Sequence, residues 1–420
     1  MTTPFRTDAE NTFDNPLYPA FWKRTAEERD AFFSRLRAAR EPIFFPYQPP
    51  RADAAPYGFY ALARHAEITE VSRHPEIFSS SPASTLEDLS PALQGDAEGS
   101  LLHMDPPRHT DMRRVVSQAF TPRAVRRYDE LITGVVKAVT RELLDKTPCD
   151  FVTEAAVQLP LRVIAAIVGV PVSAHDEVVK ATEVVTEIGD STNRHSLAAV
   201  SEAVTYFNTL MGDLARHRRV HPADDVVTTL VQATINGRHL TDAELGAFLR
   251  ILLVGGNDTV RSTLAHMLTL LTENPEQKRL LLADLDERMP GAVEEAIRHA
   301  TPGTWMRRNA TQDTTVAGHA FRTGDRLILY YISANRDEEV FDRPYAFDIT
   351  RNPNPHVGFG AAGPHYCLGA HLAKHEVGVF YRELLTHAPD IHATEPPVHT
   401  YSGLIHSITR LPCARSGSAG

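Results

Sequence analysis

The sequence predicts a mainly α-helical fold with a small β portion. A helical pattern runs from about Pro122 to Pro275, broken at Pro148, Pro171 and Pro222 but by no domain linker. The region before it alternates between turn signals and short β-prone runs. A glycine-rich loop, residues 359–369, then delivers a cysteine to the start of one more helix.

Composition is that of an ordinary globular protein, with 420 residues, 42% hydrophobic and 23% charged. No run of about twenty apolar residues occurs, and the polar amino terminus lacks the apolar segment of a signal peptide or membrane anchor. We therefore expect a cytoplasmic protein made of one domain, residues 1–420, with a flexible tail at 414–420. The net charge of −10 argues against nucleic-acid binding.

The first part of the chain, residues 14–78, predicts a small mixed sheet with short helices, because β-prone runs at 43–45 and 57–60 lie between turn signals. Residues 79–100 are rich in Ser, Pro, Gly and acids and lack periodicity. They predict a long loop, a type of segment that is often functional or disordered.

One helix is unusual at its centre. A capping box at Thr241–Glu244 opens a helix that should reach about Thr272 through the middle of the molecule, since its first half is almost entirely apolar. Its centre nevertheless reads Gly-Gly-Asn-Asp-Thr at 255–259. Glycine and a buried carboxylate are costly there, which indicates function, the alternative being a kink with a water-bonded aspartate.

Beyond Pro275, Glu295 and Arg298 share a helix face and can pair, which in isolation would be a surface ion pair of little worth. Residues 315–321 and 326–331, joined by a turn at 323–325, predict a β-hairpin.

Cys367 is a candidate metal ligand. The small residues around it let the backbone fold tightly around a bulky group, and backbone N–H groups at a helix start lower a cysteine pKa and stabilise the thiolate. A buried packing cysteine is the alternative. Cys149, Cys367 and Cys413 are too widely spaced for a disulfide framework and lack CxxC spacing, which fits a reducing compartment.

Six arginines and one acid lie between residues 108 and 127 of this otherwise acidic chain. Such a stretch can dock a small acidic partner, and a solvated helix face is the alternative.

These features occur in an order that resembles the cytochrome P450 family over essentially the whole chain. Residues 105–114 are similar to its helix C, residues 255–259 to its oxygen-activation motif, and residues 295–298 to its ExxR motif. The resemblance implies the cytochrome P450 fold, with heme b held between the central long helix and the cysteine loop.

The resemblance also assigns roles. It makes Cys367 the iron ligand and adds Arg351 to the structural pair of Glu295 and Arg298. The heme propionates would be bound by His109, Arg113, Arg308 and His365. The residues of oxygen activation would be Gly255, Asp258 and Thr259, with the Thr259 hydroxyl bonded to the Gly255 carbonyl so that the helix opens locally.

The cysteine loop departs from the family pattern in one respect. The family usually has Phe seven and Gly six residues before the cysteine, where this chain has Gly360 and Ala361, with Phe359 one residue earlier. This displacement is similar to that of actinobacterial members that oxidise sterols and methyl-branched lipids.

The resemblance implies a soluble bacterial monooxygenase that inserts one atom of O2 into a C–H bond of a lipophilic steroid, terpenoid, polyketide or branched lipid. Electrons would come from NAD(P)H through a ferredoxin reductase and a ferredoxin, docked on the arginine-rich stretch. The substrate pocket candidates are Leu252, Gly255, Thr304, Trp305, Met306, Leu404 and Ile405.

Three alternatives stay open. A zinc enzyme could use His365, Cys367, His371 and His375, the last two being four residues apart on one helix face. A heme protein could bind ligands without turnover. A family member could also couple, desaturate or close rings instead of hydroxylating.

Overall fold

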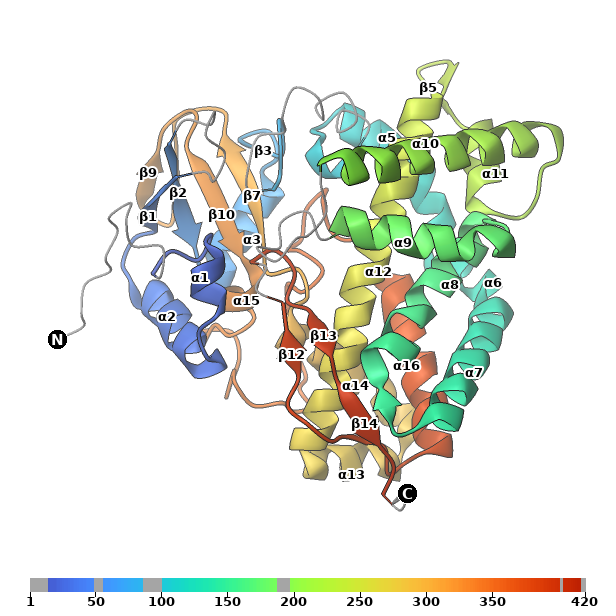
Figure 1. Ribbon diagram of the computed structural model, residues 1–420. Helices are drawn as coiled ribbons and strands as arrows, with labels where there is room; N and C mark the ends of the chain where they lie inside the picture. Colours follow the sequence, from blue (N-terminus) through green and yellow to red (C-terminus); the bar gives the residue numbers. More distant parts are fainter. Residues whose placement is uncertain (1–13, 49–55, 86–99, 187–196, 401–402, 417–420) are drawn as a thin grey trace.

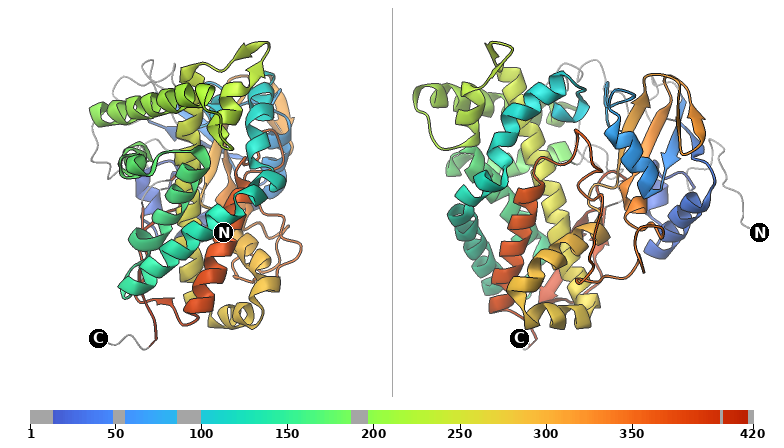
Figure 2. Two further views of the ribbon diagram at one scale, coloured as in Figure 1. Left: turned by 90° about the vertical axis from the view of Figure 1, so that its right-hand side faces the viewer. Right: turned by 180° about the vertical axis from the view of Figure 1, so that it is seen from behind.

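A helical part and a smaller sheet part lie side by side in the computed structural model, which describes residues 14–48, 56–85, 100–186, 197–400 and 403–416 (Figures 1 and 2). The long helix α12 (Asp242–Glu273) runs through the helical part. The predicted fold class, mainly α with a small β portion, is confirmed.

The main sheet has five strands in the order β1-β2-β10-β7-β3, and β2 and β10 are its parallel pair. The mixed sheet predicted for residues 14–78 is therefore confirmed, but two of its strands come from the carboxy-terminal half. The strands are β1 (Ile43–Tyr47), β2 (Tyr57–Leu62), β3 (Phe78–Ser79), β7 (Trp305–Ala310) and β10 (Arg326–Tyr330).

Alternation along β10 separates two apolar clusters. Ile328 and Tyr330 pack with aromatic residues of α1 (Pro19–Trp22) and α2 (Ala26–Ala38), whereas Leu327 and Leu329 pack on the side of α3 (His65–Arg73) and α15 (Tyr331–Ala334). A strand covered on both faces belongs at the centre of a sheet, which is where β10 lies.

The predicted β-hairpin was wrong in its pairing. Strand β8 (Thr314–Val316) pairs with β9 (His319–Phe321), and β10 pairs with β7 and β2 instead. The reason is the tight turn at Ala317 and Gly318, where φ is 50° and 82°. Two residues of positive φ close a two-residue hairpin and leave the apolar β10 free for the sheet.

Helix α12 begins with the predicted capping box, in which Glu244 N–H donates to Thr241 Oγ1 and Thr241 N–H donates to Glu244 over 2.9 Å. The helix continues without interruption through Gly255 and Gly256. It is in contact with α8, α10, α14 and α16, so residues 255–259 at its centre lie inside the helical part.

The remaining helices surround α12. They are α5 (Arg108–Val116), α6 (Pro122–Arg127), α7 (Asp129–Lys146), α8 (Gln158–Val168), α9 (His175–Thr186), α10 (Leu197–Val220), α11 (Val226–Gln232), α13 (Pro275–Ala283), α14 (Leu285–Ala300) and α16 (Ala370–His387). In the described ranges, no helix is both long and apolar enough to cross a bilayer.

The prediction of helix throughout 122–275 was wrong at three short strands, β4 (Cys149–Asp150), β5 (Thr234–Ile235) and β6 (Arg238–His239). The last two form a hairpin around Asn236 and Gly237, both at positive φ. Asn-Gly is a strong hairpin signal that overrode the helical pattern.

The carboxy-terminal strands are β11 (His392–Ala393), β12 (Val398–His399), β13 (Ile408–Arg410) and β14 (Pro412–Ala414). Strand β14 pairs with β4, which sets Cys413 directly opposite Cys149. Both are free thiols, although the fold closes the long gap between them.

Several predictions lie outside the described residues or stay untested. Most of the long loop predicted at 79–100 falls in the undescribed range 86–99, and the tail is described only to residue 416. The single-domain organisation and the cytoplasmic location stay predictions.

Candidate active site

The loop that carries Cys367 is closed by its own backbone. The N–H of Cys367 donates to the carbonyl of Phe359 over 2.9 Å, and the N–H of Tyr366 donates to the carbonyl of Gly363 over 3.1 Å. A Cβ on Gly363 would lie 2.1 Å from the carbonyl oxygen of Ser72, so only glycine lets the loop approach the end of α3 this closely.

The displaced phenylalanine has a backbone explanation. Gly360 has φ of +82°, in the left-handed region that a phenylalanine would adopt only with strain. Phe359 still packs beside the loop, with its ring centroid 6.3 Å from that of Tyr366 and 5.6 Å from Nζ of Lys374. The one-residue shift therefore keeps the aromatic contact and puts glycine where the turn needs it.

Cys367 lies in a turn and does not cap the helix that follows, contrary to the prediction. Helix α16 begins at Ala370 with Gly369 as its N-cap. The thiol keeps accessible surface, yet the protein packed around it raises its pKa, which outweighs the opposing effects of the Gly369 and Ala370 N–H groups and of Arg113. The predicted fall in pKa is thus wrong for the protein alone, and a bound metal cation would favour the thiolate.

Open space adjoins the middle of α12. Gly255 is exposed although its helix lies inside the molecule, and apart from its chain neighbours and the backbone of its own helix no atom lies within 4 Å of a Cβ added to it. Thr259 Oγ1 donates to the Gly255 carbonyl over 2.8 Å, as predicted, but the helix stays continuous instead of opening.

Asp258 is buried and has a partner that the sequence analysis missed. Its carboxylate forms an ion pair with Arg261 over 3.2 Å, one helical turn further on, and accepts a hydrogen bond from the Asn257 amide over 3.4 Å. The i,i+3 spacing of Asp258 and Arg261 was the signal that could have revealed this pair.

Four cationic or imidazole side chains converge beside the cysteine loop. The rings of His109, on α5, and His365 have centroids 4.3 Å apart, and His365 Nε2 lies 3.0 Å from Ser80 Oγ. Arg308, on β7, is only 5% exposed, and Arg113 donates to the Tyr366 carbonyl. Three separate elements therefore supply the cluster predicted from the sequence.

Burial and mutual repulsion keep its histidines neutral. Burial, together with Arg308, His109 and Arg113, lowers the pKa of His365 to about 2. Burial and Arg113 lower the pKa of His109 to about 4. These effects require the four groups to face one region.

This cluster fits a buried dianion. Among the described carboxylates, the charge of Asp105 acts to raise the pKa values of His109 and Arg308. Asp105 already accepts hydrogen bonds from Ser79 Oγ and from the Ser80 N–H, however. His109 Nδ1 is buried without a partner. The unpartnered His109 nitrogen and the positive charge of the two arginines, next to an accessible thiol, match the two propionates and the iron of a heme.

The ExxR pair is a buried network and not a surface ion pair. Arg298 Nε lies 2.8 Å from Glu295, and neither side chain is exposed to solvent. Arg351 joins Glu295 over 3.2 Å, as predicted. Arg298 also donates to the backbone carbonyls of Asn335, Pro344 and Ala346. The network fastens the segment before the cysteine loop to α14.

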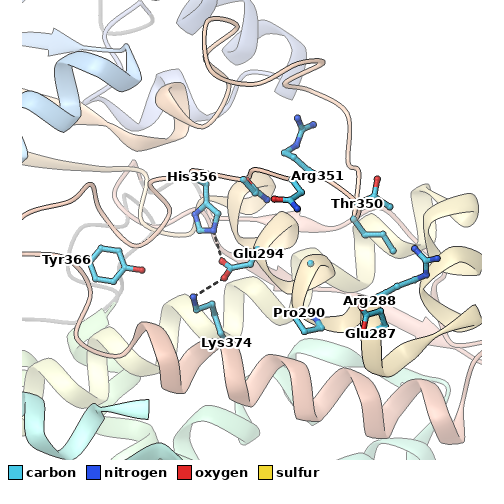
Figure 3. Close-up of a pocket in the computed structure, with 13 residues that line it drawn as sticks. Glu287, Arg288, Pro290, Glu294, Thr350, Arg351, His356, Tyr366 and Lys374 are labelled. Atoms are coloured by element: carbon cyan, nitrogen blue, oxygen red, sulfur yellow. Dashed lines mark hydrogen bonds and ion pairs between the residues drawn. The ribbon is translucent and has the colours of Figure 1, made fainter. Parts of the chain in front are cut away.

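A polar pocket of about 630 Å³ lies between α14, α16 and residues 349–356 (Figure 3). Glu294 in its wall lies 2.9 Å from both His356 and Lys374. Burial acts to raise the pKa of Glu294, but these partners outweigh it and lower the pKa to about 2. No α12 residue lines this pocket, so it is distinct from the space beside Gly255.

The substrate pocket candidates separate into two groups. Trp305 is 3% exposed within the aromatic cluster of α1 and α2, and Thr304 is fully buried with its N–H bonded to the Leu404 carbonyl. Packing accounts for both. Leu252 is 8% exposed, and Met306, Leu404 and Ile405 are partly exposed. Their contact with substrate stays a prediction.

The zinc alternative gains no support. Where ligand atoms are described, His365, Cys367, His371 and His375 do not form a metal-binding group. His375 instead lies 2.6 Å from Asp129.

Comparison with known proteins agrees with this geometry. The profile of the cytochrome P450 family matches residues 173–388. A methyl-branched lipid omega-hydroxylase of Mycobacterium tuberculosis is 38% identical over 93% of this chain and 92% of its own. A steroid C26-monooxygenase of Mycolicibacterium smegmatis is 34% identical over 84% of this chain and 82% of its own.

Solved structures are similar along the same length. A Mycobacterium marinum cytochrome P450 in complex with pseudoionone has a TM-score of 0.89 and 40% identity, covering 94% of this chain and 97% of that one. A P450 from Novosphingobium aromaticivorans has a TM-score of 0.84 and 28% identity, covering 98% and 99%. The chain therefore belongs to the cytochrome P450 family and is a monooxygenase that binds heme b.

Proposed function

We propose that this enzyme hydroxylates the end of a methyl-branched, lipophilic chain with electrons from a ferredoxin. The observation that carries the chemistry is the accessible Cys367 thiol beside four converging cationic or imidazole groups, with an exposed glycine and a threonine in α12. The omega position and C26 named for the two relatives both denote the end of an alkyl chain.

Heme would be held by Cys367 through iron and by His109, Arg113, Arg308 and His365 through its propionates. Arg forks suit carboxylates, and the unpartnered His109 Nδ1 would gain a hydrogen-bond partner. When bound, heme supplies the one-electron and O2 chemistry of the reaction.

The residues of α12 would manage protons. Thr259 Oγ1 donates to the Gly255 carbonyl, so its oxygen lone pairs are available to accept a hydrogen bond at the helix surface. Asp258 would relay protons from water towards Thr259 when its carboxylate leaves the ion pair with Arg261.

A lipophilic substrate is supported by the side chains near the predicted pocket. Leu252, Met306, Leu404 and Ile405 are apolar, and apolar walls with few fixed charges suit a lipid. The shifted Phe359 and the names of the relatives favour a methyl-branched lipid or a sterol within this class.

The electron donor would dock on α5 and α6. Arg114, Arg123 and Arg126 are exposed there, and within the described chain neither Arg123 nor Arg126 forms an ion pair. Such a patch on a protein of net charge −10 would steer an acidic ferredoxin.

The first experiment is the spectrum of the reduced protein with carbon monoxide, in the wild type and in Cys367→Ser. We expect a red-shifted thiolate Soret band that the serine variant lacks. A wild-type protein without heme, or a serine variant with the same band, would remove Cys367 from its role.

The second experiment compares matched substrates. A methyl-branched fatty acid and a sterol should shift the heme from low to high spin at lower concentration than a straight-chain acid of equal carbon number. Mass spectrometry of the product should then locate the hydroxyl at the chain end. In-chain alcohols, alkenes or coupled products would contradict the proposal and favour the oxidase alternative.

A further inference from the structure

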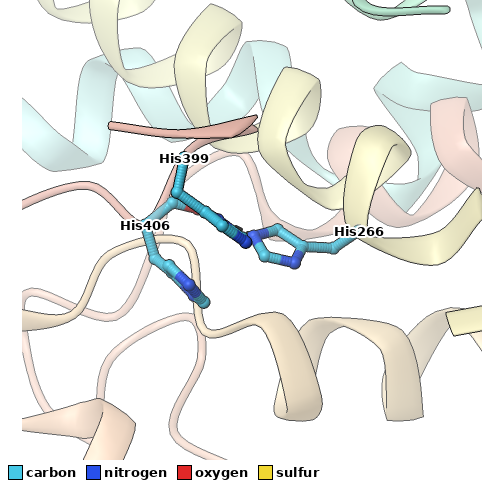
Figure 4. A group of neighbouring side chains, drawn as sticks. All are labelled: His266, His399 and His406. Carbon is cyan, nitrogen blue, oxygen red and sulfur yellow. Dashed lines mark hydrogen bonds between the residues drawn. The ribbon is translucent and has the colours of Figure 1, made fainter. Parts of the chain in front are cut away.

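Three histidines far apart in the sequence meet beside α12 in the structure. His266 lies on α12, His399 on β12 and His406 in the turn before β13 (Figure 4). Each offers one ring nitrogen, and these three nitrogens all lie within 4.8 Å of one another. The cluster is separate from the groups assigned to heme.

Hydrogen bonds fix which nitrogens are free. The His266 Nε2–H donates to the His406 carbonyl over 3.0 Å, and the His406 Nδ1–H donates to the Ala300 carbonyl over 2.8 Å, since a carbonyl can only accept. The opposite nitrogen of the His406 ring, Nε2, then carries a bare lone pair. The His266 nitrogen that faces the other two rings is Nε2 itself (Figure 4), so His266 would exchange its bond to the His406 carbonyl for a bond to the ion. His406 Nε2 and His399 Nδ1 are buried and without a hydrogen-bond partner.

This is the arrangement found around metal ions. A histidine that ligates a metal usually donates its other ring N–H to a backbone carbonyl or carboxylate, which orients the ring. His406 already has this support, because its Nδ1–H donates to the Ala300 carbonyl while Nε2 faces the other rings. Burial lowers the pKa of His266 to about 3 and that of His399 to about 4, so both imidazoles are neutral, which is the ligating form.

We propose that His266, His399 and His406 bind a divalent transition-metal ion of the zinc type. Three imidazole nitrogens suit zinc, whereas calcium and magnesium require oxygen ligands. Tetrahedral bonds of about 2.0–2.1 Å set neighbouring nitrogens about 3.3 Å apart, so the rings would close by small rotations. Water or an anion would fill the fourth position.

Nearby charges favour an anion in that position. Arg29 and Arg336 both lower the pKa of His266, and Arg29 also lowers that of His399. Their positive charge would repel a doubly charged ion. Hydroxide or chloride as the fourth ligand would offset this repulsion. Asp30 lies near both arginines, and Glu27 and Glu295 each act on one of them, on Arg29 and on Arg336 respectively.

The ion would stabilise the carboxy-terminal loop. It would tie α12 to β12 and to the segment of Leu404 and Ile405, which lies against Gly303 just before β7. Ser262 Oγ of α12 already lies 2.6 Å from Ser407 Oγ in the same segment. Metal binding would thus fix one wall of the predicted substrate pocket. A trapped water that bridges two of the lone pairs is the competing explanation.

The test uses the heme-loaded protein after EDTA treatment, which leaves heme in place. Isothermal titration with zinc chloride should give one tight site per chain, and saturating zinc should raise the thermal unfolding temperature. His399→Ala should weaken zinc binding by at least about 100-fold, because loss of outer hydrogen bonds alone weakens metal sites about 10- to 100-fold.

The matched control is the double variant His217→Ala/His221→Ala, which removes an exposed histidine pair at the carboxy-terminal end of α10, whose ring centroids lie 5.0 Å apart. It should keep the tight site. The carbon monoxide spectrum of His399→Ala verifies that the fold persists. Absence of a stoichiometric site, or equal zinc affinity in His399→Ala and wild type, would overturn the proposal in favour of trapped water.

Discussion

The Thr259 hydroxyl donates a hydrogen bond to the carbonyl of Gly255, which lies one turn earlier at the exposed part of α12. In Thr259→Ala this hydroxyl is lost while the backbone is unchanged, because alanine is a good helix former. We expect NAD(P)H consumption to continue, product per NAD(P)H to fall about tenfold or more and hydrogen peroxide to rise. Oxygen-electrode and product measurements on one sample give this ratio.

Thr263→Ala serves as the control for Thr259→Ala. Thr263 makes the same type of bond one turn later, to the Thr259 carbonyl over 2.8 Å, but it is buried. Its variant should keep normal coupling. Equal coupling in Thr259→Ala and wild type would remove Thr259 from proton delivery.

His103 shows how a buried imidazole makes stability depend on pH. Its Nδ1 accepts the Ser84 N–H over 3.1 Å, and burial and Arg307 lower its pKa to about 4. Because the unfolded chain takes up this proton below about pH 6.5, stability should be full above that pH and fall as pH drops towards 4.

We expect the free energy of unfolding to fall by roughly 1–2 kcal/mol more in the wild type than in His103→Asn between pH 7 and pH 5. Asparagine keeps an acceptor near the position of Nδ1 but does not titrate. Urea unfolding at both pH values measures the difference. Parallel losses in the two proteins would show that His103 is not the titrating group.

At the scale of elements, Arg298 joins α14 to the segment that leads to the cysteine loop. All of its N–H groups have acceptors, on Glu295 and on three backbone carbonyls. Lysine has fewer donors and no fork, so Arg298→Lys would leave buried acceptors unpaired. We expect a loss of about 3–5 kcal/mol and poor heme retention, measured by urea unfolding and by the carbon monoxide spectrum.

Arg279→Lys, on the exposed face of α13, is the matched substitution and should change stability by less than about 0.5 kcal/mol. If Arg298→Lys unfolded at the same urea concentration as the wild type, the hydrogen bonds of Arg298 would contribute nothing to the free energy of unfolding.

Helices α5 and α6 carry the proposed ferredoxin surface. In Arg123→Glu/Arg126→Glu we expect the KM for an acidic ferredoxin to rise about tenfold or more and its salt dependence to weaken, because steering is lost. Turnover supported by peroxide should be unchanged. The measurement is a ferredoxin titration at several ionic strengths.

Arg216→Glu, a charge reversal on α10, controls for net charge and should leave the KM near that of the wild type. If Arg123→Glu/Arg126→Glu bound ferredoxin as tightly as the wild type, the ferredoxin would have to dock on another surface.

At the scale of the whole molecule, the surplus charge around Arg308 makes the protein depend on its cofactor. Arg308 is buried, and burial lowers its pKa. Heme propionates would neutralise this charge, so removal of heme should lower the unfolding temperature strongly. Thermal unfolding with and without heme measures the effect.

Arg308→Leu should act with opposite sign on the two forms. It should stabilise the heme-free protein, where a buried charge disappears, and destabilise the loaded protein, where a propionate loses its partner. Equal losses in both forms would place Arg308 in a structural role unrelated to heme.

The sequence by itself determined the fold class, the central helix with its capping box, and the residues of the cysteine loop, helix α5 and the ExxR network. Local chemistry explains this success, since caps, periodicity and the need for cations around a dianion are visible residue by residue. The order of these motifs then identified the family.

Only the tertiary structure decided contacts between distant segments. It paired β10 with β2 and β7 and set Cys149 opposite Cys413. It also gathered His266, His399 and His406, whose sequence spacing carries no signal. Such contacts depend on how packed elements close long loops, and no local pattern encodes that closure.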